Sequence, residues 1–130
     1  KIVEMEILPV TALDHDGTAK YSLDQSFPLL SYSKQAYLRN CVDEAIENKL
    51  DYRTLYETDN AGDLKELVLQ GLGVAWLPKL LVEREIQENK LKVLDGKQYY
   101  LFQDVYLVKR EMSFSNRINY IWNVLIHKNK

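Results

Sequence analysis

Residues 59–94 carry the clearest pattern of hydrophobic and polar positions in the chain. Their first part predicts a helix that Asn60 can cap and that Gly71 can end, because glycine readily adopts the left-handed conformation found at helix ends. The apolar residues of this helix recur at helical spacing, at Leu64, Leu67 and Val68. We therefore expect a helix with one face in the core.

A short strand, a second helix and a second strand follow in the same stretch. The run 74–77 is apolar without polar alternation, which favours a strand covered on both faces. Pro78 ends this strand and suits the first turn of the next helix, which Asn89 can close. Residues 90–93 then alternate lysine with apolar side chains, as in a strand. The order is that of a β-α-β unit, from which parallel sheets are commonly built.

The chain before this stretch alternates between strand-like and helix-like patterns. Residues 1–8 place apolar and acidic side chains on opposite faces of a strand, and Pro9 is expected to interrupt its ladder. Residues 27–33 and 52–57 predict two further strands. The segment 34–48 between them predicts an amphipathic helix with one apolar and one charged, solvated face.

The end of the chain predicts one more strand, over the aromatic-rich residues 99–108, and an amphipathic helix over 113–128. The predicted fold class is therefore α/β, with a small, mainly parallel sheet flanked by helices. Ligands of such sheets bind beyond the carboxyl ends of the strands. Three loops are expected to gather there, at residues 31–33, 58–60 and 77–79.

Composition and charge narrow the classes of function. With 130 residues, 46% hydrophobic and 28% charged, the chain suits one globular domain or a piece of one, and the missing initiator methionine favours a piece. A net charge of −2 without a lysine and arginine stripe argues against nucleic-acid binding by this segment itself. No apolar run has membrane-spanning length and no signal peptide is visible, so we expect a cytoplasmic protein without a membrane partner.

Candidate chemistry is sparse, so the sequence predicts a binding protein and not an enzyme. It contains no nucleophile motif, no nucleotide-binding glycine loop and no metal-ligand spacing, so neither a cofactor nor a metal is expected. His15 lies in a predicted surface turn, where a solvated residue is favoured over a ligand. Cys41 lies on an apolar helix face, which favours a buried side chain over a reactive thiol, and neither Met5 nor Met112 has a special neighbourhood for oxidant sensing.

Three segments resemble the effector-binding domain of LysR-type transcriptional regulators, and they do so in the family's order. The central one reads LKELVLQGLGVAWLPKLLVEREIQENKLKVL, with the family's helix, Gly-x-Gly corner, apolar strand ending in proline, helix and strand. The others read FPLLSYSKQAYLRNCVDEAI and DVYLVKREMSFSNRINYIWNVL. The likeness covers nearly the whole chain, although the residues for most of the first lobe and for the DNA-binding winged helix-turn-helix are expected before residue 1.

The resemblance implies one lobe of a periplasmic-binding-protein type II-like domain plus crossover strands. Residues 1–10 and 99–108 would be the crossover strands between lobes, and residues 11–97 the second lobe. The helix over 113–128 would pack on the first lobe. This assigns the whole chain to a partial effector-binding domain.

The resemblance also implies a small-molecule effector in the cleft between the two lobes. The matching positions lie at the ends of three predicted strands, at Ser31, Tyr32, Ser33, Thr58, Asn60, Trp76 and Pro78. Ser33 and Asn60 suit helix caps as well as ligand contacts, and structural roles are favoured for Trp76 in the core and Pro78 at a helix start.

The partners follow from the same resemblance. The family forms antiparallel dimers, which implies a homo-oligomer, a dimer or tetramer, with contacts at helix 34–48 and strand 52–57. DNA would be bound only through an N-terminal domain that this chain lacks. The alternative is a solute-binding or transport lobe of the same architecture without a regulatory role.

Overall fold

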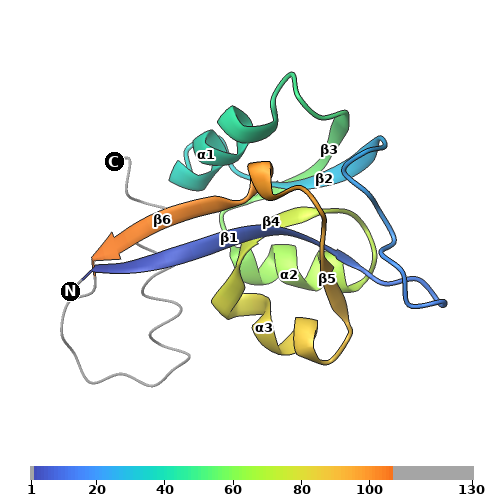
Figure 1. Cartoon of the computed structure of the whole chain (residues 1–130). Helices are drawn as coiled ribbons and strands as arrows, with labels where there is room; N and C mark the ends of the chain where they lie inside the picture. Colours follow the sequence, from blue (N-terminus) through green and yellow to red (C-terminus); the bar gives the residue numbers. More distant parts are fainter. Residues whose placement is uncertain (1, 107–130) are drawn as a thin grey trace.

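The computed structural model describes residues 2–106, and strand β1 (Ile2–Ala12) lies at the centre of their main sheet (Figure 1). β1 is antiparallel to each of its three partners: β4 (Ala75–Pro78), β5 (Leu91–Val93) and β6 (Leu101–Tyr106). β6 pairs with the first half of β1, and β5 with its last three residues. β1 thus joins the start of the described chain to three strands from its last third.

A parallel pair of strands, β2 (Phe27–Tyr32) and β3 (Tyr52–Thr58), lies beside this sheet. A parallel bridge between Leu29 and Val74 joins β2 to the segment just before β4. Two backbone hydrogen bonds, each of 2.9 Å, flank this bridge. The carboxyl ends of β2, β3 and β4 therefore point in one direction.

The predicted α/β class is confirmed, but the sheet is mixed rather than mainly parallel. β2 and β3 are parallel, whereas the partners of β1 are antiparallel to it. Because β4 and β5 are both antiparallel to β1 and lie on either side of it, they run parallel to each other. The predicted β-α-β unit is present, with a strand from the beginning of the chain inserted between its two strands.

Pro9 lies inside β1, and the expected interruption of the ladder occurs on one edge only, because the pairing with β4 continues through Pro9. The pairing with β6 stops at Ile7 and the pairing with β5 begins at Val10. The Pro9 carbonyl accepts a hydrogen bond of 2.9 Å from the Leu94 N–H. In an antiparallel strand the N–H and C=O of one residue point to the same edge, so the missing N–H falls in the gap between β6 and β5.

Helices α2 (Ala61–Leu69) and α3 (Lys79–Gln87) confirm the two helices predicted in this stretch. Gly71 follows α2 with a φ of 80°, which is the predicted left-handed end. A Cβ on Gly73 would lie 2.7 Å from the Pro28 carbonyl oxygen, so only glycine permits the close approach to β2. The glycine corner is therefore a packing turn.

The ends of α3 agree with the prediction except for one position. Pro78 is the last residue of β4 and the N-cap of α3, one step before the predicted first turn. Asn89 has a φ of 59°, and the Lys90 N–H donates to the Glu85 carbonyl at 2.8 Å. This left-handed turn closes the helix as predicted.

Helix α1 (Tyr37–Ile46) is shorter than the predicted helix over 34–48. Its N-cap is Ala36, without a side-chain cap, so the suggested capping role of Ser33 is wrong. The Ser33 carbonyl instead accepts the Ala36 N–H at 2.9 Å, in a turn that precedes the helix. The predicted apolar face is buried at Leu38, Val42 and Ile46.

The helices lie on opposite sides of the strands (Figure 1). α1 packs on β2 and β6, whereas α2 and α3 pack on the other side against β1 and β4. Within residues 2–106, no helix is long and apolar enough to cross a membrane. The predicted helix over 113–128 lies outside the described residues, and the predicted lobe boundaries stay predictions.

Candidate functional site

The carboxyl ends of β2, β3 and β4 bring together the three loops selected from the sequence. We call residues 31–33, 58–60 and 76–78 the carboxyl edge, in which the third range is the end of β4 and begins one position before the predicted loop 77–79. Tyr32 pairs with Thr58, and the Ser33 N–H donates to the Thr58 carbonyl at 3.1 Å. The Tyr32 hydroxyl donates to the Trp76 carbonyl. The predicted site residues thus lie on three neighbouring strand ends.

Ser31 is the one residue of this set whose side chain is buried without a hydrogen-bond partner among the described residues. Its exposed fraction is 3%, and its hydroxyl has neither a donor nor an acceptor in reach. Buried hydroxyls are normally paired, because leaving one unpaired costs about 1–3 kcal/mol. The Ser31 hydroxyl can therefore gain a hydrogen bond from a ligand or from water without giving up another.

Tyr32 and Trp76 are almost fully buried, and their polar atoms are used inside the protein. The Trp76 indole N–H donates to the Tyr99 carbonyl at 2.8 Å, while its own carbonyl accepts the Tyr32 hydroxyl. Burial raises the pKa of the Tyr32 phenol well above its ordinary value, so the hydroxyl keeps its proton and donates. Pro78 is also buried. These three residues therefore belong to the buried part of the carboxyl edge.

Asn60 caps α2, as predicted. Its Oδ1 accepts the N–H groups of Gly62 at 2.7 Å and Asp63 at 3.3 Å. The Thr58 hydroxyl oxygen accepts the Asn60 N–H at 3.2 Å and donates to the Asp63 carboxylate at 3.4 Å. The N-terminus of α2, with its partial positive charge, is therefore fixed at the carboxyl edge.

Arg39 contacts the carboxyl edge from α1, although it lies on the helix face that the sequence pattern predicted to be charged and solvated. Its guanidinium donates to the Asp43 carboxylate at 2.9 Å, the Tyr32 carbonyl at 3.0 Å and the Glu57 carboxylate at 2.9 Å. Burial lowers the pKa of Arg39, but the hydrogen bonds to Asp43 and Glu57 outweigh burial and raise it. Only the spacing of four residues to Asp43 could have revealed one of these contacts.

The sulfur residues lie away from this constellation. Cys41 is half-buried on α1, where the Gln103 amide donates to its sulfur at 3.6 Å. Burial raises the pKa of the Tyr37 phenol, and the neighbouring Cys41 raises it further by a smaller amount. Met5 is buried, and Met112 lies outside the described residues.

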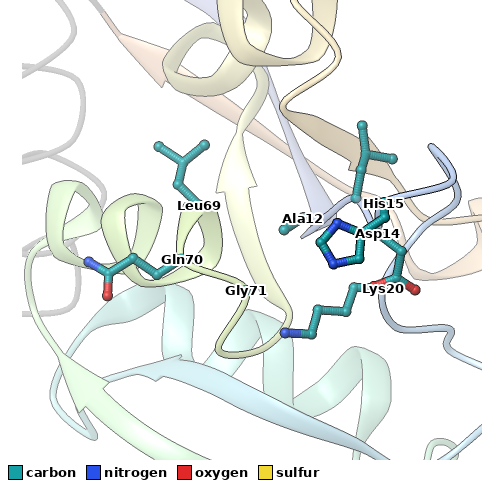
Figure 2. Close-up of a pocket in the computed structure, with 8 residues that line it drawn as sticks. Ala12, Asp14, His15, Lys20, Leu69, Gln70 and Gly71 are labelled. Atoms are coloured by element: carbon teal, nitrogen blue, oxygen red, sulfur yellow. The ribbon is translucent and has the colours of Figure 1, made fainter.

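A hollow lies at the other end of α2, with a volume of about 250 Å³. We call it the turn hollow, and its wall includes His15, Lys20 and Gly71. Figure 2 shows the side chains of His15 and Lys20 close to one another beside Gly71, with Gln70 pointing away. The Tyr21 hydroxyl donates to the Gly71 carbonyl at 3.3 Å. His15 is exposed, as predicted for a turn residue, and the described residues contain no group of three metal-ligating side chains.

Comparison with known sequences finds relatives along nearly the whole chain. Residues 1–126 match the family model of the LysR substrate binding domain. The chain is 34% identical to the HTH-type transcriptional regulator YjiE of Escherichia coli K12 over 98 residues. This alignment covers 73% of the chain and 32% of YjiE. It is 33% identical over 98 residues to the HTH domain-truncated transcriptional regulator QseD of Escherichia coli O157:H7, covering 73% of this chain and 40% of QseD.

Solved structures give the same fold. Full-length HypT from Salmonella typhimurium, described as a hypochlorite-specific LysR-type transcriptional regulator, matches with a TM-score of 0.75 and 25% identity over 96% of this chain and 46% of HypT. A mutant of the HypT regulatory domain matches with a TM-score of 0.74 and 27% identity, over 95% of this chain and 66% of that domain. The chain spans less than half the length of each curated relative that it matches.

Proposed function

This chain belongs to the LysR substrate-binding domain family, and on that premise we propose that it is the effector-sensing and dimerisation part of a LysR-type transcriptional regulator. It forms the second lobe and crossover strands of the sensor domain. A small molecule binds at the carboxyl edge, in a cleft completed by the first lobe. Binding shifts the equilibrium between conformations of the whole regulator and so changes its DNA binding. We place this regulator in the cytoplasm.

The observation that carries this proposal is the unpartnered, buried hydroxyl of Ser31 at the point where three strand ends meet. A ligand oxygen that accepts its hydrogen bond would remove the cost of the unpaired group. The fixed N-terminus of α2 lies at the same edge and favours a negatively charged group. The ligand class that suits both features is a small molecule with an anionic or carbonyl oxygen.

Self-association is proposed through α1 and β3. Among the described strands β3 pairs only with β2, so its other edge is open. Leu55 and Tyr56 on β3 are exposed, with exposed fractions of 51% and 46%. An open strand edge with large apolar side chains is a suitable surface for a second chain. DNA is contacted by a separate domain of the whole regulator.

The decisive experiment uses the intact regulator and a panel of small carboxylates and phosphates. A compound that binds at the carboxyl edge raises the melting temperature and changes the affinity for operator DNA. In Ser31→Ala the Kd for this compound is expected to rise about tenfold, since one buried hydrogen bond is lost.

Ser22→Ala is the matched control, because Ser22 is exposed and outside the carboxyl edge. Equal affinity of the Ser31→Ala and Ser22→Ala variants would contradict the proposed site. A ligand that binds without any change in DNA affinity would instead favour a solute-binding lobe without a regulatory role.

A further inference from the structure

Arg39 connects the proposed effector loop to the outer strand of the sheet. Its three acceptors lie in three separate elements: Asp43 in α1, the carbonyl of Tyr32 at the end of β2, and Glu57 in β3. The exposed fraction of the Arg39 side chain is 16%, so these contacts are largely shielded from water. Charged hydrogen bonds under such shielding are stronger than those of an exposed ion pair.

Through Glu57, the Arg39 hydrogen bonds extend to β3. Glu57 is the cross-strand partner of Ser31, and it lies on the strand whose other edge is open among the described strands. Its side chain is 37% exposed, so a second chain placed beside β3 can contact it. Any movement of Glu57 must displace the guanidinium or break its hydrogen bond, because the guanidinium is a rigid planar fork.

The same guanidinium nitrogen, Nη1, donates both to Glu57 and to the Tyr32 carbonyl. Tyr32 lies between Ser31, with its unpartnered hydroxyl, and Ser33, whose N–H is bound to the Thr58 carbonyl. Displacing the guanidinium therefore loosens the backbone on which the Ser31 hydroxyl is held. An unpaired, partly buried arginine is costly, which couples the two contacts in energy.

We propose that Arg39 is a positioning residue that relays the state of the β3 edge to the loop Ser31–Ser33. The relay deepens the proposed function and rests on it for its regulatory meaning: assembly of a second copy beside β3 orders the effector loop. By reciprocity, a ligand that orders the loop strengthens assembly. The connection itself exists whether or not a ligand binds, so it can be measured separately.

The test measures amide hydrogen exchange at Ser33 by NMR in the full 130-residue chain. In Arg39→Gln the Ser33 amide is expected to exchange about tenfold faster, because local opening no longer breaks a charged hydrogen bond. Glu57→Gln, which leaves the fold intact through its partial exposure, is expected to give about a threefold increase. Glu44→Gln is the matched control on the exposed face of α1, with less than about a twofold change.

A double-mutant cycle then tests the relay. The double variant Arg39→Gln, Glu57→Gln is expected to exchange no faster than Arg39→Gln alone, because both changes break one connection. Multiplied effects, or a Ser33 amide that exchanges within about twofold of the unaltered protein in Arg39→Gln, would overturn the proposal. Val68 in α2 serves as the folding reference, since its amide must keep its exchange rate in every variant.

These outcomes separate the relay from the proposed function. Faster exchange at Ser33 in Arg39→Gln, together with an intact regulator whose melting temperature no compound raises through Ser31, would keep the relay and reject the effector site. Ligand binding that depends on Ser31 together with unchanged exchange in Arg39→Gln would keep the effector site and reject the relay.

Discussion

The two ends of α2 lie in regions that hold their polar groups differently. The N-terminus of α2 lies at the carboxyl edge, which contains the buried Ser31 and Tyr32 and the helix cap Asn60. At its C-terminus, the turn hollow is lined by His15 and Lys20, both exposed. One helix of nine residues, about 13 Å long at 1.5 Å per residue, separates the two regions.

The difference concerns the cost of an unpaired group. An exposed side chain such as His15 already has water as a partner, so a ligand only replaces water and gains little. A buried and unpaired hydroxyl such as Ser31 has no such alternative, so a hydrogen bond from a ligand is a net gain. Selective binding is therefore expected at the carboxyl edge and not in the turn hollow, although the turn hollow is open to solvent.

The largest expected effect is that of Leu64→Ala, which is expected to destabilise the carboxyl edge and the turn hollow together. Leu64 is fully buried in the middle of α2, and its truncation is expected to lower the free energy of unfolding by about 3 kcal/mol through the cavity left behind. Urea denaturation measures this loss, with Glu66→Ala on the exposed face of α2 as control. A loss below about 1 kcal/mol would show that α2 does not pack against the core as described.

Tyr32→Phe is expected to weaken the carboxyl edge alone. The Trp76 carbonyl loses the donor that the phenol supplies, and a buried acceptor without a partner costs about 2 kcal/mol. The matched change at the turn hollow is Tyr21→Phe, which removes a longer and less buried hydrogen bond to Gly71, and it is expected to cost below about 1 kcal/mol. Equal losses in urea denaturation would remove the distinction between the two regions.

The same two variants also differ in alkaline solution. Burial raises the pKa of Tyr32 well above 10.0, whereas the tyrosine of an unfolded chain ionises near 10. Above pH of about 10 the folded state keeps a proton that the unfolded state loses, so the free energy of unfolding falls as pH rises. Below that pH both states are protonated and the effect vanishes.

Tyr32→Phe removes this contribution to the slope, and Tyr21→Phe leaves it in place. Urea denaturation between about pH 8 and about pH 11, a range that spans the ordinary tyrosine pKa, measures both slopes. Identical slopes in the two variants would contradict the assignment of the effect to Tyr32.

Changes at the two helix ends are expected to have smaller and similar effects on stability. Asn60→Ala removes two cap hydrogen bonds and is expected to cost about 1 kcal/mol. Gly71→Ala places a Cβ at a φ of 80° and is expected to cost about 1 kcal/mol as well. Only Asn60→Ala should also weaken ligand binding by the intact regulator, since only this end lies at the carboxyl edge. Weaker binding in both variants would show that the cap acts through general stability.

Local features of the sequence predicted much of this fold. The cap at Asn60, the left-handed Gly71 and the apolar stripe of α2 depend on neighbours within a few residues, and each is confirmed. The insertion of β1 between β4 and β5 depends on pairing across most of the chain. Alternation of side chains says that a strand forms but not which strand it pairs with.

The candidate site divides in the same way. The gathering of the three loops follows from the directions of the strands, and it was predicted from their order. The burial of the Ser31 hydroxyl depends on packing, which the residue type does not reveal. Arg39 was missed because two of its acceptors, the Tyr32 carbonyl and the Glu57 carboxylate, lie outside its own helix. The sequence pattern of a charged residue on a polar helix face is the same whether its side chain contacts water or the end of a strand.

The smallest expected effect is that of His15→Ala in the turn hollow. His15 is exposed on a turn whose backbone is held by neighbours, including the Asp14 N–H bonded to the Thr18 carbonyl at 2.8 Å. Its truncation is expected to change the free energy of unfolding by less than about 0.5 kcal/mol. The Kd of any compound that depends on Ser31 should also stay within about twofold of the unaltered protein. A larger change in that Kd would mean that the turn hollow, at the far end of α2, takes part in binding, and the contrast between the two regions would then have to be abandoned.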